Sequence, residues 1–300
     1  MGLPVAQAGE DIGTVAVKRY FLGQVDIRCH LFDAATASAL KAGYLQARNS
    51  ALRNGYTMAQ LAPWLARSRQ AATAANCQAP EIVAEATLAR DSFRSFAAQS
   101  SLYLPTLRTA WRATRAHAGE SSWRLVQFQN TIEANAALGL YGTLSHNRFA
   151  VMAAFRDGAR PFSARLLVRD PSVAQIGLID PTPYSLSRAM PQDLSQFGFV
   201  SFTANAASQT SVNLSPAVSA NAAGFGPTGT YVGTQVPQTA QRFDFPTRAF
   251  SAIAQIDPRE DVIIVFDCQD GERFLRFEVG DFITGLTYIG LPSPYGQPAG

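Results

Sequence analysis

Histidines are the first residues to consider for chemistry, because imidazole serves both as a metal ligand and as a general base. The chain has three, His30, His117 and His146. None belongs to an H-E-x-x-H motif or stands at zinc-ligand spacing from a cysteine, so we predict no metal site. Cys29 adjoins His30, but neighbouring helical residues point in different directions and do not share an ion. A hydrolase site that joins His146 to a serine and an acid from distant parts of the chain stays open as an alternative.

Four carboxylates lie close together near the C-terminal end of the sequence: Asp267, Asp270, Glu272 and Asp281. Paired carboxylates can exchange protons with a substrate or bind calcium. The calcium-loop spacing is missing, and Asp270-Gly271 is a typical turn pair. We therefore expect solvated charges around a hairpin. Cys268 has no neighbouring base that would activate it, which predicts a buried thiol on a strand.

The stretch "GFGPTG", from Gly224 to Gly229, matches the G-x-G-x-x-G pattern of dinucleotide-binding proteins. That pattern binds a pyrophosphate only where a strand precedes it and a helix follows it. Pro227 lies inside the stretch, and the following "TYVGTQVPQ" is no helix. We predict no nucleotide and no other cofactor.

Charge is unevenly distributed along the chain. The net charge is +3, but residues 1–118 hold 13 Lys and Arg against 7 Asp and Glu, and residues 119–300 hold 12 against 15. This difference indicates two domains with different surfaces. Apart from two arginines near the start of the chain, the first part contains Arg48, Arg53, Arg67, Arg69, Arg90, Arg94, Arg108, Arg112 and Arg115. Without interleaved aromatic residues or a nucleic-acid motif, they favour a polar or protein-contact face, and we predict no nucleic-acid partner.

Helical patterns extend over residues 10–118. Asp33 is placed to cap a helix that ends at Gly55, and Thr57 is placed to cap the next one. Pro80 opens a third helix. Its expected apolar positions are Val83, Leu88, Phe93 and Phe96. A last short helix is predicted from Thr106 to Ala116, with Arg108, Arg112 and Arg115 along one side.

Two cysteines flank the first two of these capped helices. Cys29 comes just before a helix of about 21 residues, and Cys77 follows a returning helix of about 19. Because the two legs are both about 30 Å long, the cysteines should end beside each other. The pattern favours a Cys29–Cys77 disulfide over two buried free thiols. Such a bond indicates an oxidising compartment.

The N-terminus fits the same compartment. Ala6-Gln7-Ala8 has the small-x-small pattern that precedes signal-peptidase cleavage, so residues 1–9 are interpreted as a signal-peptide remnant or a disordered leader. No stretch approaches the ~20 apolar residues of a transmembrane helix. We expect a periplasmic or secreted protein.

Strand patterns dominate residues 119–290, and a disordered tail is expected over residues 291–300. "WRLVQFQN" alternates as a half-buried strand does, a hairpin is predicted around Ser145-His146-Asn147, and another around Asp270-Gly271. A short helix is predicted before Asp257. The fold class is therefore α+β: an N-terminal antiparallel helical bundle followed by a mainly antiparallel β domain.

One segment of the β-rich part is unusual. Residues 194–241 carry no charge of either sign and are rich in Ala, Ser, Asn, Gln and Thr. An unstructured loop of that length is uncommon in a compact domain. The segment predicts either extra strands or a long surface excursion that makes contacts, with a tolerated insertion as the alternative.

The run "DIRCHLFDAATASALKAGYLQARNSALRNGY", with "ANCQAPE" downstream and "IDPREDVIIVFDCQDGERFLRFEVGDF" near the end, resembles uncharacterised exported bacterial proteins with a cysteine-paired helical front half. The resemblance implies export and the Cys29–Cys77 pair, and no activity. We expect a non-enzymatic envelope protein that binds or scaffolds an envelope or surface protein. The alternatives are the hydrolase described above and a structural subunit of a virion or surface appendage.

Overall fold

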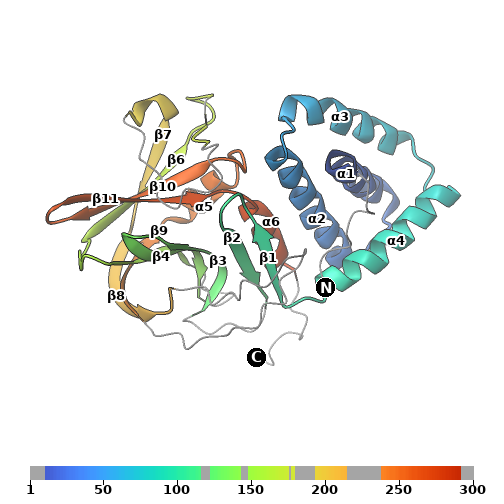
Figure 1. Cartoon of the computed structure of the whole chain (residues 1–300). Helices are drawn as coiled ribbons and strands as arrows, with labels where there is room; N and C mark the ends of the chain where they lie inside the picture. The colour runs from blue at the N-terminus through green and yellow to red at the C-terminus, as the bar shows by residue number, and fades with distance from the viewer. Residues whose placement is uncertain are drawn as a thin grey trace.

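The computed structural model describes residues 11–115, 122–142, 148–175, 177–179, 193–214 and 238–291. Four helices come first, and two antiparallel sheets with two further helices follow. Figure 1 shows the helices beside the sheets, with α6 and the β1–β2 pair between the two parts. The predicted α+β class is confirmed. The predicted leader and most of the predicted tail lie outside the described residues.

The helical part consists of α1 (Ile12–Cys29), α2 (Ala34–Arg53), α3 (Met58–Ala74) and α4 (Pro80–Ala97). Local capping explains where they begin. The Asp33 carboxylate accepts a hydrogen bond from the Thr36 amide at 2.7 Å. Thr57 and Gln60 form a reciprocal capping box at the start of α3, which satisfies two amides that have no partner inside the helix. These predicted helix starts are confirmed.

Helix α1 lies at the centre of the helical part. It packs against α2 and α3, and α4 packs against α2. Figure 1 shows α2, α3 and α4 arranged around α1. The prediction for α4 is wrong at two of its four apolar positions, because Val83 is 44% exposed and Leu88 is 64% exposed. The buried side of that helix is formed instead by Ile82, Ala86, Ala89, Phe93 and Phe96.

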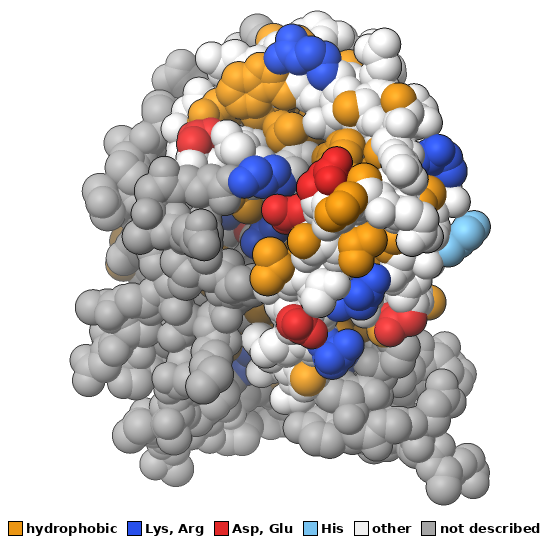
Figure 2. All heavy atoms as spheres, turned by 90° about the vertical axis from the view of Figure 1, so that its right-hand side faces the viewer, with side chains coloured by type: hydrophobic (Ala, Val, Ile, Leu, Met, Phe, Trp, Pro, Cys, Tyr) orange, Lys and Arg blue, Asp and Glu red, His pale blue; other side chains and the backbone are white. Residues whose placement is uncertain are grey.

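The outer side of the helical part carries a mixture of side chains. Figure 2 shows apolar, basic and acidic groups interspersed over this face. The exposed apolar residues Ile27, Val83 and Leu88 belong to α1 and α4. Single exposed apolar residues are normal on a protein surface and by themselves indicate no site. No helix among the described residues is long and apolar enough to cross a membrane.

The predicted helix from Thr106 to Ala116 is wrong. The chain forms a strand pair there, β1 (Ser101–Pro105) and β2 (Ala110–Thr114). In β2 the buried residues alternate with half-buried ones, since Trp111 and Ala113 point to the core. Burial with a period of two overrides the helix propensity of the Ala- and Arg-rich sequence. The seven-stranded sheet thus begins before the predicted boundary at residue 118.

The remaining strands are β3 (Trp123–Asn130), β4 (Ala134–Tyr141), β5 (Arg148–Phe155), β6 (Ser163–Arg169), β7 (Phe199–Thr203), β8 (Ala206–Val212), β9 (Gln238–Phe245), β10 (Asp261–Cys268) and β11 (Gly271–Glu278). One sheet has the order β1-β2-β3-β4-β5-β9-β8, and the other has the order β11-β10-β6-β7. Every strand pair is antiparallel. The predicted hairpin at Asp270-Gly271 is confirmed, whereas Ser145-His146-Asn147 lies outside the described residues.

The main core contains residues of both sheets and of the two later helices, α5 (Thr247–Ile253) and α6 (Phe282–Ile289). Aromatic rings link the layers: Phe266 lies 5.3 Å from Phe155 and 5.8 Å from Phe243 between ring centroids. Phe96 of α4 contacts Tyr288 of α6 at 5.4 Å. The core is therefore continuous from the sheets into the helical part, and α6 connects them. The predicted short helix before Asp257 corresponds to α5.

Candidate functional site

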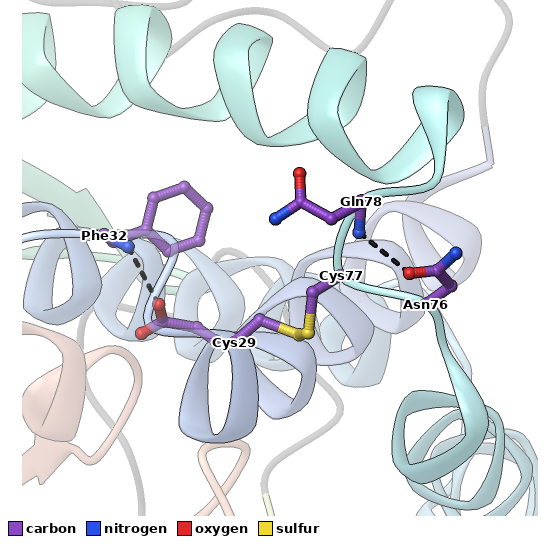
Figure 3. The surroundings of a disulfide bond; sticks show 6 residues. Cys29, Phe32, Asn76, Cys77 and Gln78 are labelled. Atoms are coloured by element: carbon purple, nitrogen blue, oxygen red, sulfur yellow. Dashed lines mark hydrogen bonds between the residues drawn. A yellow bond between two sulfur atoms is a disulfide. The ribbon is translucent and has the colours of Figure 1, made fainter.

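The disulfide is present where the helix lengths place it. Cys29 ends α1, Cys77 lies between α3 and α4, and their Cα atoms are 5.6 Å apart. Figure 3 shows the bond between these two segments. On one side the Asp26 carboxylate accepts a hydrogen bond from the Phe32 amide at 2.9 Å. On the other, the Asn76 side chain accepts one from the Gln78 amide at 3.0 Å. Both turns are thus held in shape by local hydrogen bonds.

A buried carboxylate, Glu278 at the end of β11, attaches the β1–β2 turn to the core. Its side chain accepts hydrogen bonds from the amides of Arg108 and Thr109 at 3.1 and 3.0 Å, and from the Thr106 and Thr109 hydroxyls. Its backbone carbonyl accepts from the Trp111 indole at 3.1 Å. Several donors on one carboxylate satisfy the charge that burial would otherwise penalise. The arrangement is structural.

A second buried carboxylate joins α2 to α6. Asp281 accepts hydrogen bonds from Asn49 at 2.8 Å and from Arg53 at 2.9 Å. Burial raises the pKa of this carboxyl above its ordinary value, although Arg53 acts in the opposite direction. The prediction of a solvated hairpin charge is wrong for Asp281, because the residue follows the hairpin and enters the contact with α2. We call Glu278, Asp281 and their partners the polar junction.

The expected arginine face of residues 108–115 does not exist. Arg108 forms an ion pair with Glu278 at 3.5 Å between nitrogen and oxygen. Arg112 lies over the ring of Phe128. Arg115 is 3% exposed and donates to the carbonyls of Ala97, the last residue of α4, and of Gln99; its guanidinium lies 4.7 Å from the Tyr288 ring centroid. Arg108 and Arg112 thus contact strands β11 and β3, and only Arg115 belongs to the contact between helices and sheets.

The other residues that could do chemistry remain apart. His30 is an exposed C-cap of α1, and Cys268 is a buried free thiol, as predicted. Burial raises the pKa of that thiol. Asp267 and Glu272 form ion pairs with Arg165 at the surface, and Asp270 pairs with Arg273.

Other predicted positions cannot be placed. His117, His146 and residues 224–229 lie outside the described residues. Within the described ranges, no group of three His, Cys, Asp or Glu side chains could hold a metal.

The uncharged segment contributes the edge strand of both sheets. Strand β7 ends the four-stranded sheet and β8 ends the seven-stranded one. Two residues connect them, and both stay bonded to the sheets: the Ala204 amide donates to the Ala164 carbonyl, and the Asn205 amide donates to the Asp244 carbonyl. Residues 199–212 therefore form one bent edge that passes from sheet to sheet. We call it the β7–β8 edge; Figure 1 shows it in yellow.

Within the part of the chain that the structure describes, most of the β7–β8 edge is exposed and no other strand covers it. Ala206, Ala207, Ser208, Gln209 and Ser211 are all exposed, and no residue of the edge is charged. Among the described strands, β8 pairs with β9 alone and β7 with β6 alone. An edge strand presents backbone donors and acceptors that can pair with another chain, and proteins usually block such edges with charges, proline or bulges.

The opposite edges of the two sheets are blocked. In β11, "GERFLRFE", four of the eight residues are charged; Glu272 and Arg273 lie at the surface, whereas the side chains of Arg276 and Glu278 are buried in ion pairs. Strand β1 ends at Pro105, whose ring removes a backbone donor. Figure 1 shows β1 on the side toward the helices. Among the described strands, each sheet thus has one protected edge and one edge open to another strand.

The candidate site is therefore an edge able to bind an extended segment through backbone hydrogen bonds. Its signal in the sequence is the lack of charge between residues 194 and 241, whereas nothing in the sequence indicates the partners of Asp281. Comparisons of the chain with protein-family models, curated proteins and solved structures found no match.

Proposed function

We propose that this protein is a non-enzymatic binding or scaffolding protein of the cell envelope that pairs with an extended segment of a protein partner along the β7–β8 edge. The contrast between this edge and the charged β11 edge carries the proposal. Backbone pairing supplies affinity in strand addition, and the small polar side chains of β8 leave room for the added strand.

The polar junction supports this function by holding the sheets against the helices. An added strand forms hydrogen bonds along the whole edge only where that edge is already extended and rigid. In β8 every residue from Ala206 to Val212 is in register with β9. The helical part reaches this sheet through α6, which packs against α2 on one side and against β1, β2 and β3 on the other.

Site-specific photo-crosslinking in the native cells tests the proposal. A photoreactive residue at Ser208 in β8 should give a discrete crosslinked protein product. The same residue at Glu272, exposed on β11, is the matched control and should give none. Equal products from the two positions, or none from Ser208, would overturn binding at this edge.

We place the protein in the periplasm or outside the cell. The Cys29–Cys77 disulfide supports this location, since such bonds persist in oxidising compartments. Mass spectrometry of the protein from native cells, with and without reduction, tests it. A chain that begins after Ala8 and holds the linked cysteines is expected. A chain that keeps residues 1–8 and has three free thiols would contradict export.

A further inference from the structure

The β7–β8 edge carries one inference beyond the proposed function, on which it rests. We infer that the occupant of β8 is the β8 strand of a second copy of this chain, paired antiparallel about a two-fold axis at Gln209. The result is a dimer in which the seven-stranded sheet continues from one copy into the next. Such an interface is isologous, because each copy uses the same surface.

The sequence of β8 is compatible with pairing to itself. An axis at Gln209, the middle of Ala206–Val212, brings all of the strand into register. Gln209 then faces its counterpart, and Ser208 faces Thr210 of the other copy. Polar pairs of this kind stabilise a sheet, whereas like charges directly opposite each other destabilise it. A charged residue in β8 would lie near its own copy across the axis and would repel it. Strand β8 contains no charged residue.

The neighbouring strand does not oppose this pairing. The charged residues of β9 nearest to β8 are Arg242 and Asp244, and they form an ion pair with each other, with 2.9 Å between nitrogen and oxygen. Within β9 these two charges compensate each other, and Asp244 also pairs with Arg148 of β5 at 3.3 Å. Two copies can therefore approach along β8 with no net charge on either β8 or β9.

A second copy also has an advantage over a flexible peptide. Its β8 is already held extended by seven register pairs with β9. A flexible peptide must lose conformational freedom when it becomes a strand, which weakens its binding. Of the two uncharged edge strands, β8 is the longer, with seven residues against the five of β7.

Sedimentation equilibrium of the full chain tests the dimer directly. The wild-type protein should show twice the mass of the chain. Gln209→Lys should raise the dissociation constant by about fivefold or more, since two ammonium groups would face each other. The control is Gln196→Lys, an exposed position of the same uncharged segment that lies outside the strands; it should leave the dimer unchanged.

A cysteine scan tests the position of the axis. All three native cysteines are either bonded or buried, so Gln209→Cys adds an accessible thiol without competition. Under mild oxidation Gln209→Cys should give a covalent dimer. Ala206→Cys should not, because an axis at Gln209 leaves its two copies about 20 Å apart along the strand.

The outcomes separate the two proposals. A monomeric wild-type protein, or a dimer that Gln209→Lys does not weaken, would overturn self-pairing. If crosslinks at Ser208 then join a different protein, binding at the edge stands and only the identity of the occupant is wrong. If Ser208 forms no crosslink at all, both proposals fail.

Discussion

Arg53 of α2 and Asp281 at the start of α6 form an ion pair at 2.9 Å, with the aspartate side chain fully buried. The two residues lie 228 positions apart in the sequence and join α2 of the helical part to α6, which packs on the seven-stranded sheet. Asn49 donates a further hydrogen bond to the same carboxylate. Removing one member of such a pair leaves a buried charge without compensation, which is more harmful than removing both.

Asp281→Ala should therefore lower the free energy of unfolding by about 3–5 kcal/mol. Arg53→Leu should also destabilise, and the double variant should cost less than the sum of the two single changes. Denaturant unfolding measures all three. Asp91→Ala is the control, since the Asp91–Arg94 pair is 67% and 73% exposed and should change stability by less than about 1 kcal/mol. Additive effects at Arg53 and Asp281 would contradict the coupling.

Gly280 lies beside the polar junction and has a positive φ of 47°. A Cβ atom there would come within 2.1 Å of Thr106 Cγ2, and Thr106 is held in place by hydrogen bonds to Glu278 and Thr109. Gly280→Ala should destabilise by about 3 kcal/mol or more, from backbone strain and overpacking together. Gly271 also has positive φ, but its Cβ would meet nothing within 4 Å. Gly271→Ala should cost only about 1–2 kcal/mol, and equal losses in thermal unfolding would refute the clash.

The Cys29–Cys77 bond spans 48 residues of sequence. On the chain-entropy account, reduction should lower the free energy of unfolding by about 4 kcal/mol. Unfolding curves with and without a reductant give this difference. Cys268→Ala keeps the bond and serves as the control, so reduction should lower its stability by the same amount. A wild-type protein that loses nothing on reduction would show that the bond does not constrain the unfolded chain.

The Asp33 cap predicts a pH dependence. Hydrogen bonds from Thr36 lower the pKa of Asp33 below its ordinary value of 3.8. The folded protein therefore binds this proton less tightly than the unfolded chain does, and the stabilisation is complete above 3.8 and is lost as the pH falls through the lowered pKa. Asp33→Ala should cost about 1 kcal/mol at neutral pH, and the difference from wild type should shrink in acid. Asp33→Asn keeps an acceptor without the titrating group, so its advantage over Asp33→Ala should not change with pH. A wild-type advantage that stays constant would exclude the titration.

Sequence patterns predicted those parts of the fold that depend on interactions between residues close together in the chain. The caps Asp33 and Thr57, the helix start at Pro80 and the turn at Asp270-Gly271 depend on residues within a few positions of one another. The disulfide could be predicted because two helices of similar length lie between its cysteines. In each case the partners are close in sequence or joined by regular structure of known length.

Errors arose where distant partners decide the outcome. The stretch that forms β1 and β2 is rich in helix-forming residues, but its pairing with β3 and the burial of Trp111 impose a strand. On α4 the packing against Val25 of α1 and Ala72 of α3 selects Ile82 over Val83 for burial. The sequence predicts a surface charge at Asp281, because its partner Arg53 is 228 positions away and no local pattern indicates it. The sequence indicates the β7–β8 edge only as a segment without charge. That its two strands lie at the edges of the two sheets follows from the order of the strands, which no local pattern predicts.

The disulfide has a further consequence for how the molecule responds to proteases. Residues 29–77 form a closed covalent ring that contains α2, α3 and the turn at Asn54-Gly55 between them. Both turn residues are exposed and accessible to a cutting enzyme. A single cut there releases no fragment, because both new ends remain linked through the two sulfur atoms. Without reductant the clipped protein should remain one covalent molecule, heavier than the intact chain by one water. Only reduction should separate the N-terminal piece, which carries α1 and α2, from the rest.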